Sequence, residues 1–252
     1  MNIGGFYMKI VTVKDKFDHR VSLVPELIKK LLKLEGTKVI VEKGLSDIFS
    51  DQDYIDAGAS LMERDDALQN ADIILGVSAG NEAVPEWNAN LVSPGRVLYF
   101  VKELKKHVNV PVTYCDNNYY WKNQLTEVAK YVDFISIHIY PVWLGANVYD
   151  GIQMSIRELN EIKSLYPDKQ IIITETGWPT NSNGGQIPKN HANESNQLLF
   201  NSEIDKYTEN NGIICFFFEA FDEHWKGSDA LDEPEKHWGY YYDDRTPKRI
   251  KS

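Results

Sequence analysis

The sequence predicts an α/β fold, and a closed (β/α)8 barrel of the TIM type is the simplest form of it. Short runs rich in β-branched and aromatic residues alternate with amphipathic stretches of helical period along the whole chain, which is the pattern of parallel α/β architecture. Eight such runs can be counted, and eight strands close a barrel of this type. With 252 residues and 42% hydrophobic content, the chain is long enough for one large core or for two smaller domains.

The expected elements follow in the order strand, helix, strand. The expected strands are residues 9–14, 38–42, 59–62, 73–79, 111–115, 133–139, 170–175 and 212–219. Helices are expected between them at residues 25–34, 96–107, 124–130, 155–166 and 192–210. The chain contains no internal repeat and no low-complexity tract.

The composition favours a neutral or small polar ligand. There are 27 basic against 37 acidic residues, giving a net charge of −10, so nucleic acid and anionic membranes should repel the protein. The 6 Trp and 14 Tyr offer flat faces with a polar edge that suit sugar rings. Cys115 and Cys215 lie in apolar runs and are expected to be inert thiols. Since residues 1–7 do not resemble a signal peptide and no apolar stretch is long enough to span a membrane, the chain as written is expected to be cytoplasmic.

Several of the later expected strands end in polar or charged residues. These strand ends are Gly80-Asn81-Glu82, His138 to Pro141, Glu175 to Trp178 and Glu219 to Glu223. One carboxylate after a strand can simply cap a helix, but the ends of parallel barrel strands converge on one face. Two carboxylates held there can hydrolyse a glycosidic bond, and a separation of roughly 5 Å between them would mean retention of configuration. No metal is expected, because the histidines are scattered.

Longer motifs around these residues resemble glycoside hydrolase family 17. The motifs are Gly80-Asn81-Glu82, Thr174 to Pro179, Phe217 to Glu223, Trp225-Lys226 and Glu235 to Gly239. Their order and spacing also match, and the resemblance covers residues 76 to about 247. It implies a (β/α)8 barrel that acts on β-1,3-glucan or β-1,3-1,4-glucan without a cofactor.

The resemblance also implies roles for individual residues. Glu82 matches the acid/base, Glu175 matches the nucleophile, and Tyr140 would donate a hydrogen bond to that nucleophile. The implied substrate-binding residues are Asn81, for the sugar 2-hydroxyl, Tyr140, the polar Glu219, Glu223, Lys226 and Glu235, and Trp178 and Trp225 as sugar platforms. His138 is interpreted as an ordinary strand histidine. To act as an acid Glu82 needs desolvation or negative neighbours, whereas Glu175 needs donors that keep it charged.

Residues 8–75 resemble a different family, the N-terminal domain of the NAD(P) transhydrogenase α subunit and alanine dehydrogenases. The segments that carry this resemblance are 9–14, 19–25, 56–59 and 70–75. Arg20 would match a substrate contact of the dehydrogenases, but Gly76 stands where a lysine is expected and no Gly-rich dinucleotide loop is present. We therefore expect a scaffold without nicotinamide cofactor. The sequence then divides into residues 1–75 and 76–252, a mosaic whose barrel is imperfectly closed if the borrowed strands do not match the rest.

Three alternatives to the leading hypothesis, a retaining β-glucan hydrolase, remain open. A β-1,3-glucanosyltransferase would pass the same covalent intermediate to another sugar. A catalytically impaired glucan-binding protein would result if Glu82 and Glu175 were misplaced by ~1 Å. A nicotinamide-binding fragment would be excluded by an NADH titration without binding. In the first two the partner is a β-glucan polysaccharide or oligosaccharide, and linkage preference, endo or exo action and oligomeric state stay open.

Overall fold

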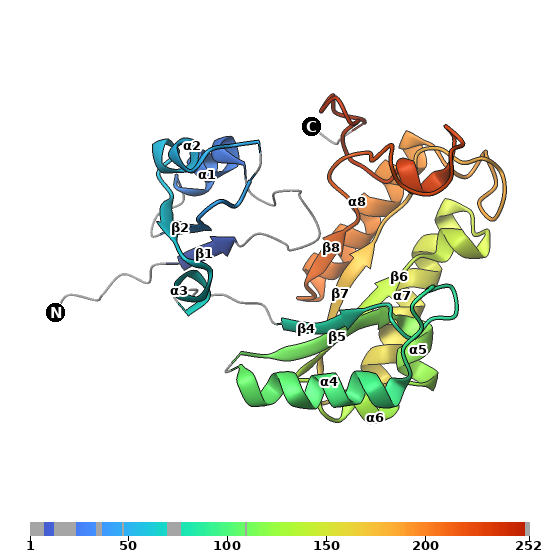
Figure 1. The fold of residues 1–252 in the computed structure, drawn as a ribbon. Helices are drawn as coiled ribbons and strands as arrows, with labels where there is room; N and C mark the ends of the chain where they lie inside the picture. The colour runs from blue at the N-terminus through green and yellow to red at the C-terminus, as the bar shows by residue number, and fades with distance from the viewer. Residues whose placement is uncertain are drawn as a thin grey trace. The chain divides into compact units, whose positions relative to one another are not determined.

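The computed structural model describes residues 8–12, 24–33, 37–46, 48–69, 77–108 and 110–249. They belong to two compact units, residues 1–75 and residues 76–252, and each unit is built on parallel strands that alternate with helices (Figure 1). Arg20, Gly76 and part of the expected strand 73–79 lie outside the described residues.

The first unit contains a three-stranded parallel sheet in the order β1-β2-β3. Its strands are β1 (Met8–Thr12), β2 (Thr37–Glu42) and β3 (Ser60–Met62), and its helices are α1 (Pro25–Leu31), α2 (Asp51–Asp56) and α3 (Arg64–Gln69). Ser50 starts α2 with a capping box, in which its hydroxyl accepts from the Asp53 amide and the Asp53 carboxylate accepts from the Ser50 amide. A small core that includes Ile28, Val41 and Tyr54 fills this unit.

The second unit contains a five-stranded parallel sheet in the order β4-β5-β6-β7-β8. Its strands are β4 (Val77–Asn81), β5 (Val112–Asn117), β6 (Phe134–Ile139), β7 (Gln170–Thr176) and β8 (Cys215–Phe217). Its α-helices are α4 (Pro94–His107), α5 (Asn118–Asn123), α6 (Thr126–Ala129), α7 (Val148–Leu165) and α8 (Glu194–Asn210), with short 3-10 helices at Pro141–Leu144 and Pro234–Lys236. Since sequential strands are also spatial neighbours, their carboxyl ends lie along one edge of the sheet.

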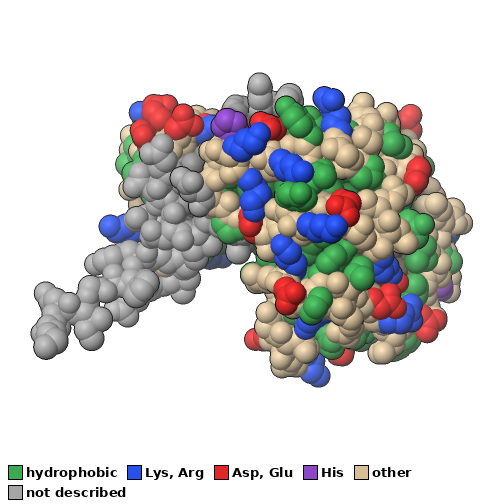
Figure 2. All heavy atoms as spheres, turned by 90° about the horizontal axis from the view of Figure 1, so that it is seen from below, with side chains coloured by type: hydrophobic (Ala, Val, Ile, Leu, Met, Phe, Trp, Pro, Cys, Tyr) green, Lys and Arg blue, Asp and Glu red, His purple; other side chains and the backbone are tan. Residues whose placement is uncertain are grey.

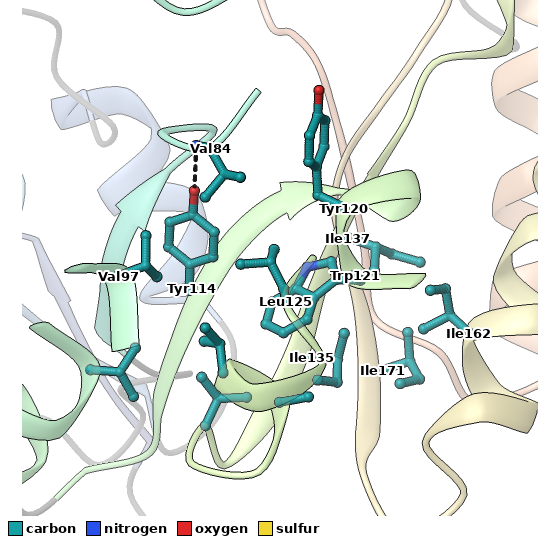
Figure 3. Close-up of a cluster of buried hydrophobic side chains, with 14 of the residues drawn as sticks. Val84, Val97, Tyr114, Tyr120, Trp121, Leu125, Ile135, Ile137, Ile162 and Ile171 are labelled. Atoms are coloured by element: carbon teal, nitrogen blue, oxygen red, sulfur yellow. Dashed lines mark hydrogen bonds between the residues drawn. The ribbon is translucent and has the colours of Figure 1, made fainter. Parts of the chain in front are cut away.

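The main core lies between the central strands of this sheet and the helices that cover it. All six residues of β6 are buried, as expected for a parallel strand covered on both faces. The Trp121 ring is fully buried and its indole N–H donates to the Ser136 carbonyl oxygen at 2.8 Å. Figure 3 shows part of this core, where Trp121, Leu125 and Ile135 gather beside Tyr114.

The eight expected strands are all present, although their ends differ by several residues. The last one is confined to Cys215–Phe217 where residues 212–219 were expected. Helix α7 begins at Val148, earlier than expected, because the Asn147 side chain accepts from the amides of Tyr149 and Asp150 and caps it there. Three helices of six residues each, α2, α3 and α5, were missed because they are too short to show a helical period.

The surface carries charges of both signs. On the face in Figure 2, basic side chains are interspersed with acidic and hydrophobic ones. No helix in the described part of the chain is both long and apolar enough to cross a membrane. Both cysteines are free thiols.

Candidate active site

The register of the second sheet brings the predicted catalytic residues together. Asn81 at the end of β4 pairs with Cys115 on β5, and His138 on β6 pairs with Glu175 on β7. Glu82 follows Asn81 directly, and its amide donates to the Cys115 carbonyl oxygen at 2.9 Å. The two predicted catalytic glutamates are thus held at the same edge of the sheet.

Glu82 is held by loop contacts just beyond its strand. Its backbone has a φ of +42°, a left-handed conformation that is uncommon for residues other than glycine and is found more often at functional sites. The Asn88 side chain donates to the Glu82 carbonyl oxygen at 2.7 Å. The next residue, Ala83, donates its amide to the Tyr114 hydroxyl at 2.8 Å. These contacts fix the direction in which the Glu82 side chain leaves the sheet.

His138 lies between the two glutamates. Its Nδ1 is 2.8 Å from Oε1 of Glu82, and its Nε2 is 3.6 Å from Oε1 of Glu175. The imidazole is fully buried, whereas the side chains of Glu82 and Glu175 are 25% and 29% exposed. The sequence interpretation of His138 as an ordinary strand histidine missed this bridge, which depends on three strands being in register.

The bridge changes the protonation of its members. Burial would lower the pKa of His138, but hydrogen bonds with Cys115 and Glu82 and the charge of Glu175 outweigh it and raise that pKa to about 10. These contacts favour the imidazolium form of His138. The pKa of Glu175 is raised chiefly by burial, against the opposing effects of His138 and Tyr140. Burial would raise the pKa of the Cys115 thiol, but its hydrogen bonds outweigh burial and lower that pKa.

Tyr140 contacts the other oxygen of Glu175. Its hydroxyl donates to Glu175 Oε2 at 3.0 Å, which is the contact expected from the sequence. The Tyr140 ring packs edge-on against Trp238, with 5.2 Å between ring centroids. Burial and the charge of Glu175 raise the Tyr140 pKa well above its ordinary value, so the hydroxyl keeps its proton and remains a donor.

A second charged cluster surrounds Lys226 in the segment after β8. Its Nζ lies 2.7 Å from Glu219 Oε2 and 2.6 Å from Glu223 Oε2, and 4.2 Å from the centroid of the Phe218 ring. Burial raises the pKa of Glu219 to about 7 in spite of Lys226. Burial also raises the pKa of Glu235, which is influenced by the charges of Lys226, Glu82 and Glu175. Lys226 and Glu235 therefore interact electrostatically with the predicted catalytic glutamates.

Two tryptophans of this unit present their rings to solvent. Trp225 is 71% exposed and Trp87 is 62% exposed. The Trp87 indole N–H donates to Glu82 Oε2 at 3.4 Å, and its ring packs edge-on against Tyr120. Trp87 was not among the predicted site residues. Its position only five residues after Glu82 is the sequence feature that could have placed it at the site. Asn81 is exposed at the end of β4, and its predicted contact with a sugar hydroxyl stays a prediction.

Trp178 does not have the open face that was predicted for it. Its ring is fully buried and packs on Phe200 with 5.0 Å between ring centroids. Its indole N–H donates to the His191 carbonyl oxygen at 2.8 Å. The prediction of a sugar platform is therefore wrong for this side chain, because its ring packs against the residues of α7 and α8 and not toward the solvent.

Comparison with known proteins identifies relatives of a large part of the chain. The model of the BtgE/BtgC glycoside hydrolase domain matches residues 19–239. A glucan 1,3-beta-glucosidase of Arthroderma benhamiae is 26% identical over 71% of this chain and 61% of its own length. A glucan 1,3-beta-glucosidase of Schizosaccharomyces pombe is 31% identical over 56% of this chain and 44% of its own length. The chain spans less than two thirds of either relative.

Solved structures show the same fold. An endo-laminarinase from Formosa has a TM-score of 0.66 at 22% identity, over 93% of this chain and 74% of its own. A glycoside hydrolase family 17 β-1,3-glucanosyltransferase from Rhizomucor miehei has a TM-score of 0.64 at 18% identity, over 97% of this chain and 96% of its own. These similarities confirm the predicted α/β fold class, and the described strands form one three-stranded and one five-stranded parallel sheet.

The comparisons do not support the transhydrogenase resemblance of the first segment. The glycosidase family model begins at residue 19 and runs through the boundary between the two units without interruption. Residues 19–75 are therefore matched as part of the same domain as the glutamates. The chain belongs to the BtgE/BtgC glycoside hydrolase domain family.

Proposed function

We propose that this chain is a retaining glycoside hydrolase that cleaves β-1,3-linked glucan through a covalent glycosyl-enzyme, with Glu175 as nucleophile and Glu82 as acid/base. The observation that carries the proposal is the arrangement around His138, which contacts Glu82 at 2.8 Å and lies 3.6 Å from Glu175. Glu175 also receives the Tyr140 hydroxyl on its second oxygen. Two carboxylates at one strand edge, each oriented by its own partners, are what hydrolysis of a glycosidic bond requires, and retention requires them to lie roughly 5 Å apart.

The reaction has two steps. In the first, the Glu175 carboxylate attacks the anomeric carbon while the bond to the leaving oxygen breaks and Glu82 delivers a proton to that oxygen. In the second, Glu82 takes a proton from water, the resulting hydroxide attacks the anomeric carbon, and the ester bond to Glu175 breaks. The Tyr140 hydroxyl holds the nucleophile in place in both steps.

The substrate class rests on the relatives and on the exposed aromatic rings. The relatives carry the names glucan 1,3-beta-glucosidase and glucan endo-1,3-beta-glucosidase, and an active-site mutant of the Rhizomucor miehei enzyme has been solved with laminaritriose. Trp87 and Trp225 offer large exposed rings that suit the apolar faces of glucose units. Lys226 and the acidic side chains around it supply hydrogen-bond partners for sugar hydroxyls.

A second candidate function is transfer of the glycosyl group to another sugar. It is favoured by the likeness to the Rhizomucor miehei β-1,3-glucanosyltransferase, which extends over nearly the full length of both chains. The first step would be unchanged, and a glucan hydroxyl would replace water in the second.

The test is incubation of the purified protein with laminarin and with short β-1,3-gluco-oligosaccharides, followed by anomeric proton NMR. We expect products with retained configuration from the wild-type chain and none from Glu175→Gln. Products longer than the starting oligosaccharide would identify the transferase. Absence of turnover by a folded wild-type chain would contradict both candidates and favour a protein that only binds glucan.

A further inference from the structure

We propose that His138 is a positioning residue that acts through Glu82: it stores the proton that Glu82 passes to the leaving group, and it regains that proton when the glycosyl-enzyme is hydrolysed. The proposal rests on the glycosidase function proposed above and adds a role for a fully buried residue. It starts from the geometry of the bridge, in which Nδ1 contacts Glu82 at 2.8 Å while Nε2 lies 3.6 Å from Glu175.

The burial of the His138 ring limits where its proton can go. His138 is fully buried, so a proton leaving the imidazole must pass to a neighbouring side chain. The Nδ1 contact with Glu82 is at hydrogen-bond distance and the Nε2 contact with Glu175 is longer than that. Glu82 is 25% exposed and can reach a substrate. Of the two carboxylates, Glu82 is therefore the one placed to take the His138 proton.

Ionisable side chains surround the His138 ring. Four ionisable groups influence His138: Glu82 from the end of β4, Cys115 and Asp116 from β5, and Glu175 from β7. The two glutamates favour the imidazolium, and the pKa of Asp116 is raised to about 6, chiefly by burial. With the glutamates ionised, the group of Glu82, His138 and Glu175 carries a net charge of −1. The imidazolium is thus held in place by the negative charge of Glu175 as well as by Glu82.

The proposed reaction removes one of these charges, that of Glu175. When Glu175 forms an ester with the sugar its negative charge disappears, and the imidazolium loses part of what stabilises it. The His138 proton then moves to Glu82 as Glu82 protonates the leaving oxygen. After this step Glu82 is a carboxylate, His138 is neutral and Glu175 is an ester, so the net charge remains −1. Hydrolysis reverses the transfer, since Glu82 takes a proton from water and His138 recovers one.

The same arrangement accounts for the environment of Glu82. An acid/base is expected to be kept protonated by desolvation or by negative neighbours, yet Glu82 is partly exposed and its carboxylate contacts an imidazolium. In our proposal, the proton held by His138 takes the place of the desolvation that Glu82 lacks. It also explains why a strand position that would otherwise be apolar carries a histidine.

The test compares two substrates whose leaving groups differ in their need for a proton. Laminari-oligosaccharides leave as sugar alcohols and need one, whereas 2,4-dinitrophenyl β-laminaribioside leaves as a stable phenolate and does not. For His138→Gln at neutral pH we expect kcat/KM for the oligosaccharide to fall by about 10² or more and kcat/KM for the dinitrophenyl substrate to change by less than about tenfold.

Tyr140→Phe is the matched control, because Tyr140 contacts Glu175 but not Glu82 in the hydrogen bonds described. It should lower kcat/KM for both substrates by a similar factor. Equal losses for both substrates in His138→Gln would overturn the proposal and leave His138 a structural role only. Unchanged activity on both substrates would overturn it as well.

A measurement on the wild-type protein does not depend on the variant folding. With 15N-labelled histidine, NMR should show His138 as an imidazolium in the free protein at neutral pH. A neutral ring in the free protein would contradict the proposal, because such a ring has no proton to pass to Glu82. Mass spectrometry separates this result from failure of the proposed function, because a covalent adduct on Glu175 after incubation with 2-deoxy-2-fluoro-laminaribiosyl fluoride would show that the retaining reaction takes place.

Discussion

The two glutamates of the site are held in different ways. Glu175 lies inside β7, its neighbours in the sheet are set by strand register, and the Tyr140 hydroxyl contacts one of its oxygens. Glu82 lies one residue beyond β4 with a left-handed backbone, and loop contacts from Asn88 hold it. One carboxylate is therefore positioned by the sheet and the other by the loop that follows a strand.

This difference matches the work proposed for each group. A nucleophile must point at one carbon atom, and a strand with a fixed hydrogen-bond partner gives that precision. An acid/base must act on a leaving sugar in one step and on water in the next. His138 connects the two sides, so the loop-held group stays aligned with the sheet-held one. We therefore expect substitution of Glu175 to lower activity strongly on every substrate. The loss of activity from substitution of Glu82 should depend on the substrate.

The largest effect is expected from Glu175→Gln. The amide occupies the same space but cannot form the glycosyl ester, so kcat/KM should fall by at least about 10⁴-fold on every substrate. The measurement is kcat/KM on laminari-oligosaccharide and on the dinitrophenyl substrate. As a control, the circular dichroism spectrum of the variant should match that of the folded wild-type protein. Retention of more than a few per cent of wild-type activity would show that another residue is the nucleophile.

The next effect is expected from Glu82→Gln. Loss of a general acid costs about 10² to 10⁴-fold, and this loss should appear on laminari-oligosaccharide but not in the glycosylation of the protein by the dinitrophenyl substrate. Azide, which needs no base, should restore turnover of the dinitrophenyl substrate and yield a glycosyl azide. If oligosaccharide and dinitrophenyl substrate were affected equally, Glu82 would not be the acid.

A smaller effect is expected from Tyr114→Phe, which acts on Glu82 from the core. The Tyr114 hydroxyl accepts from the amides of Ala83 and Val84, at 2.8 and 3.2 Å, and donates to Asp116; Figure 3 shows the bond with Val84. Removing the hydroxyl leaves these part-buried and buried amides without that acceptor, which costs about 1 to 3 kcal/mol of stability. We also expect kcat on oligosaccharide to fall about tenfold, because the loop that holds Glu82 loses an anchor.

Thermal unfolding and oligosaccharide kinetics check this prediction, and Tyr166→Phe is its control. The Tyr166 hydroxyl donates to the Trp121 carbonyl oxygen and its ring packs against the same core. Tyr166→Phe should therefore lower stability by a comparable amount without changing kcat. If both variants lowered kcat alike, the effect of Tyr114 would be one of general stability.

The strands and the two glutamates could be predicted from sequence because each depends on local pattern. β-branched runs indicate strands, and a carboxylate directly after such a run falls at the carboxyl end whatever the rest of the chain does. The position of His138 between the two glutamates could not be predicted, since it needs the register of β4, β6 and β7 at once. The Trp178 ring was misplaced because the direction of a side chain after Gly177 depends on its packing, here against Phe200, which no local pattern records.

The smallest effect is expected from Trp87→Ala, which removes an exposed ring beside the acid/base Glu82. Its ring is exposed and its N–H reaches Glu82 Oε2 at 3.4 Å, so a sugar protonated by Glu82 would lie beside it. Stacking on an aromatic ring is worth about 1 kcal/mol, and Trp87→Ala should raise KM for longer laminari-oligosaccharides by about fivefold. The dinitrophenyl substrate has no sugar on its leaving side, so its KM should hardly change.

Tyr149, which is 70% exposed in the first turn of α7, provides the control for removal of an exposed ring. Tyr149→Ala should leave KM unchanged for both kinds of substrate. An equal rise in KM for both substrates in Trp87→Ala would place the ring on the other side of the scissile bond. Trp87 would then not bind the leaving sugar beside Glu82. A residue that contacts only the leaving sugar cannot change the KM of the dinitrophenyl substrate, which has no sugar in that position.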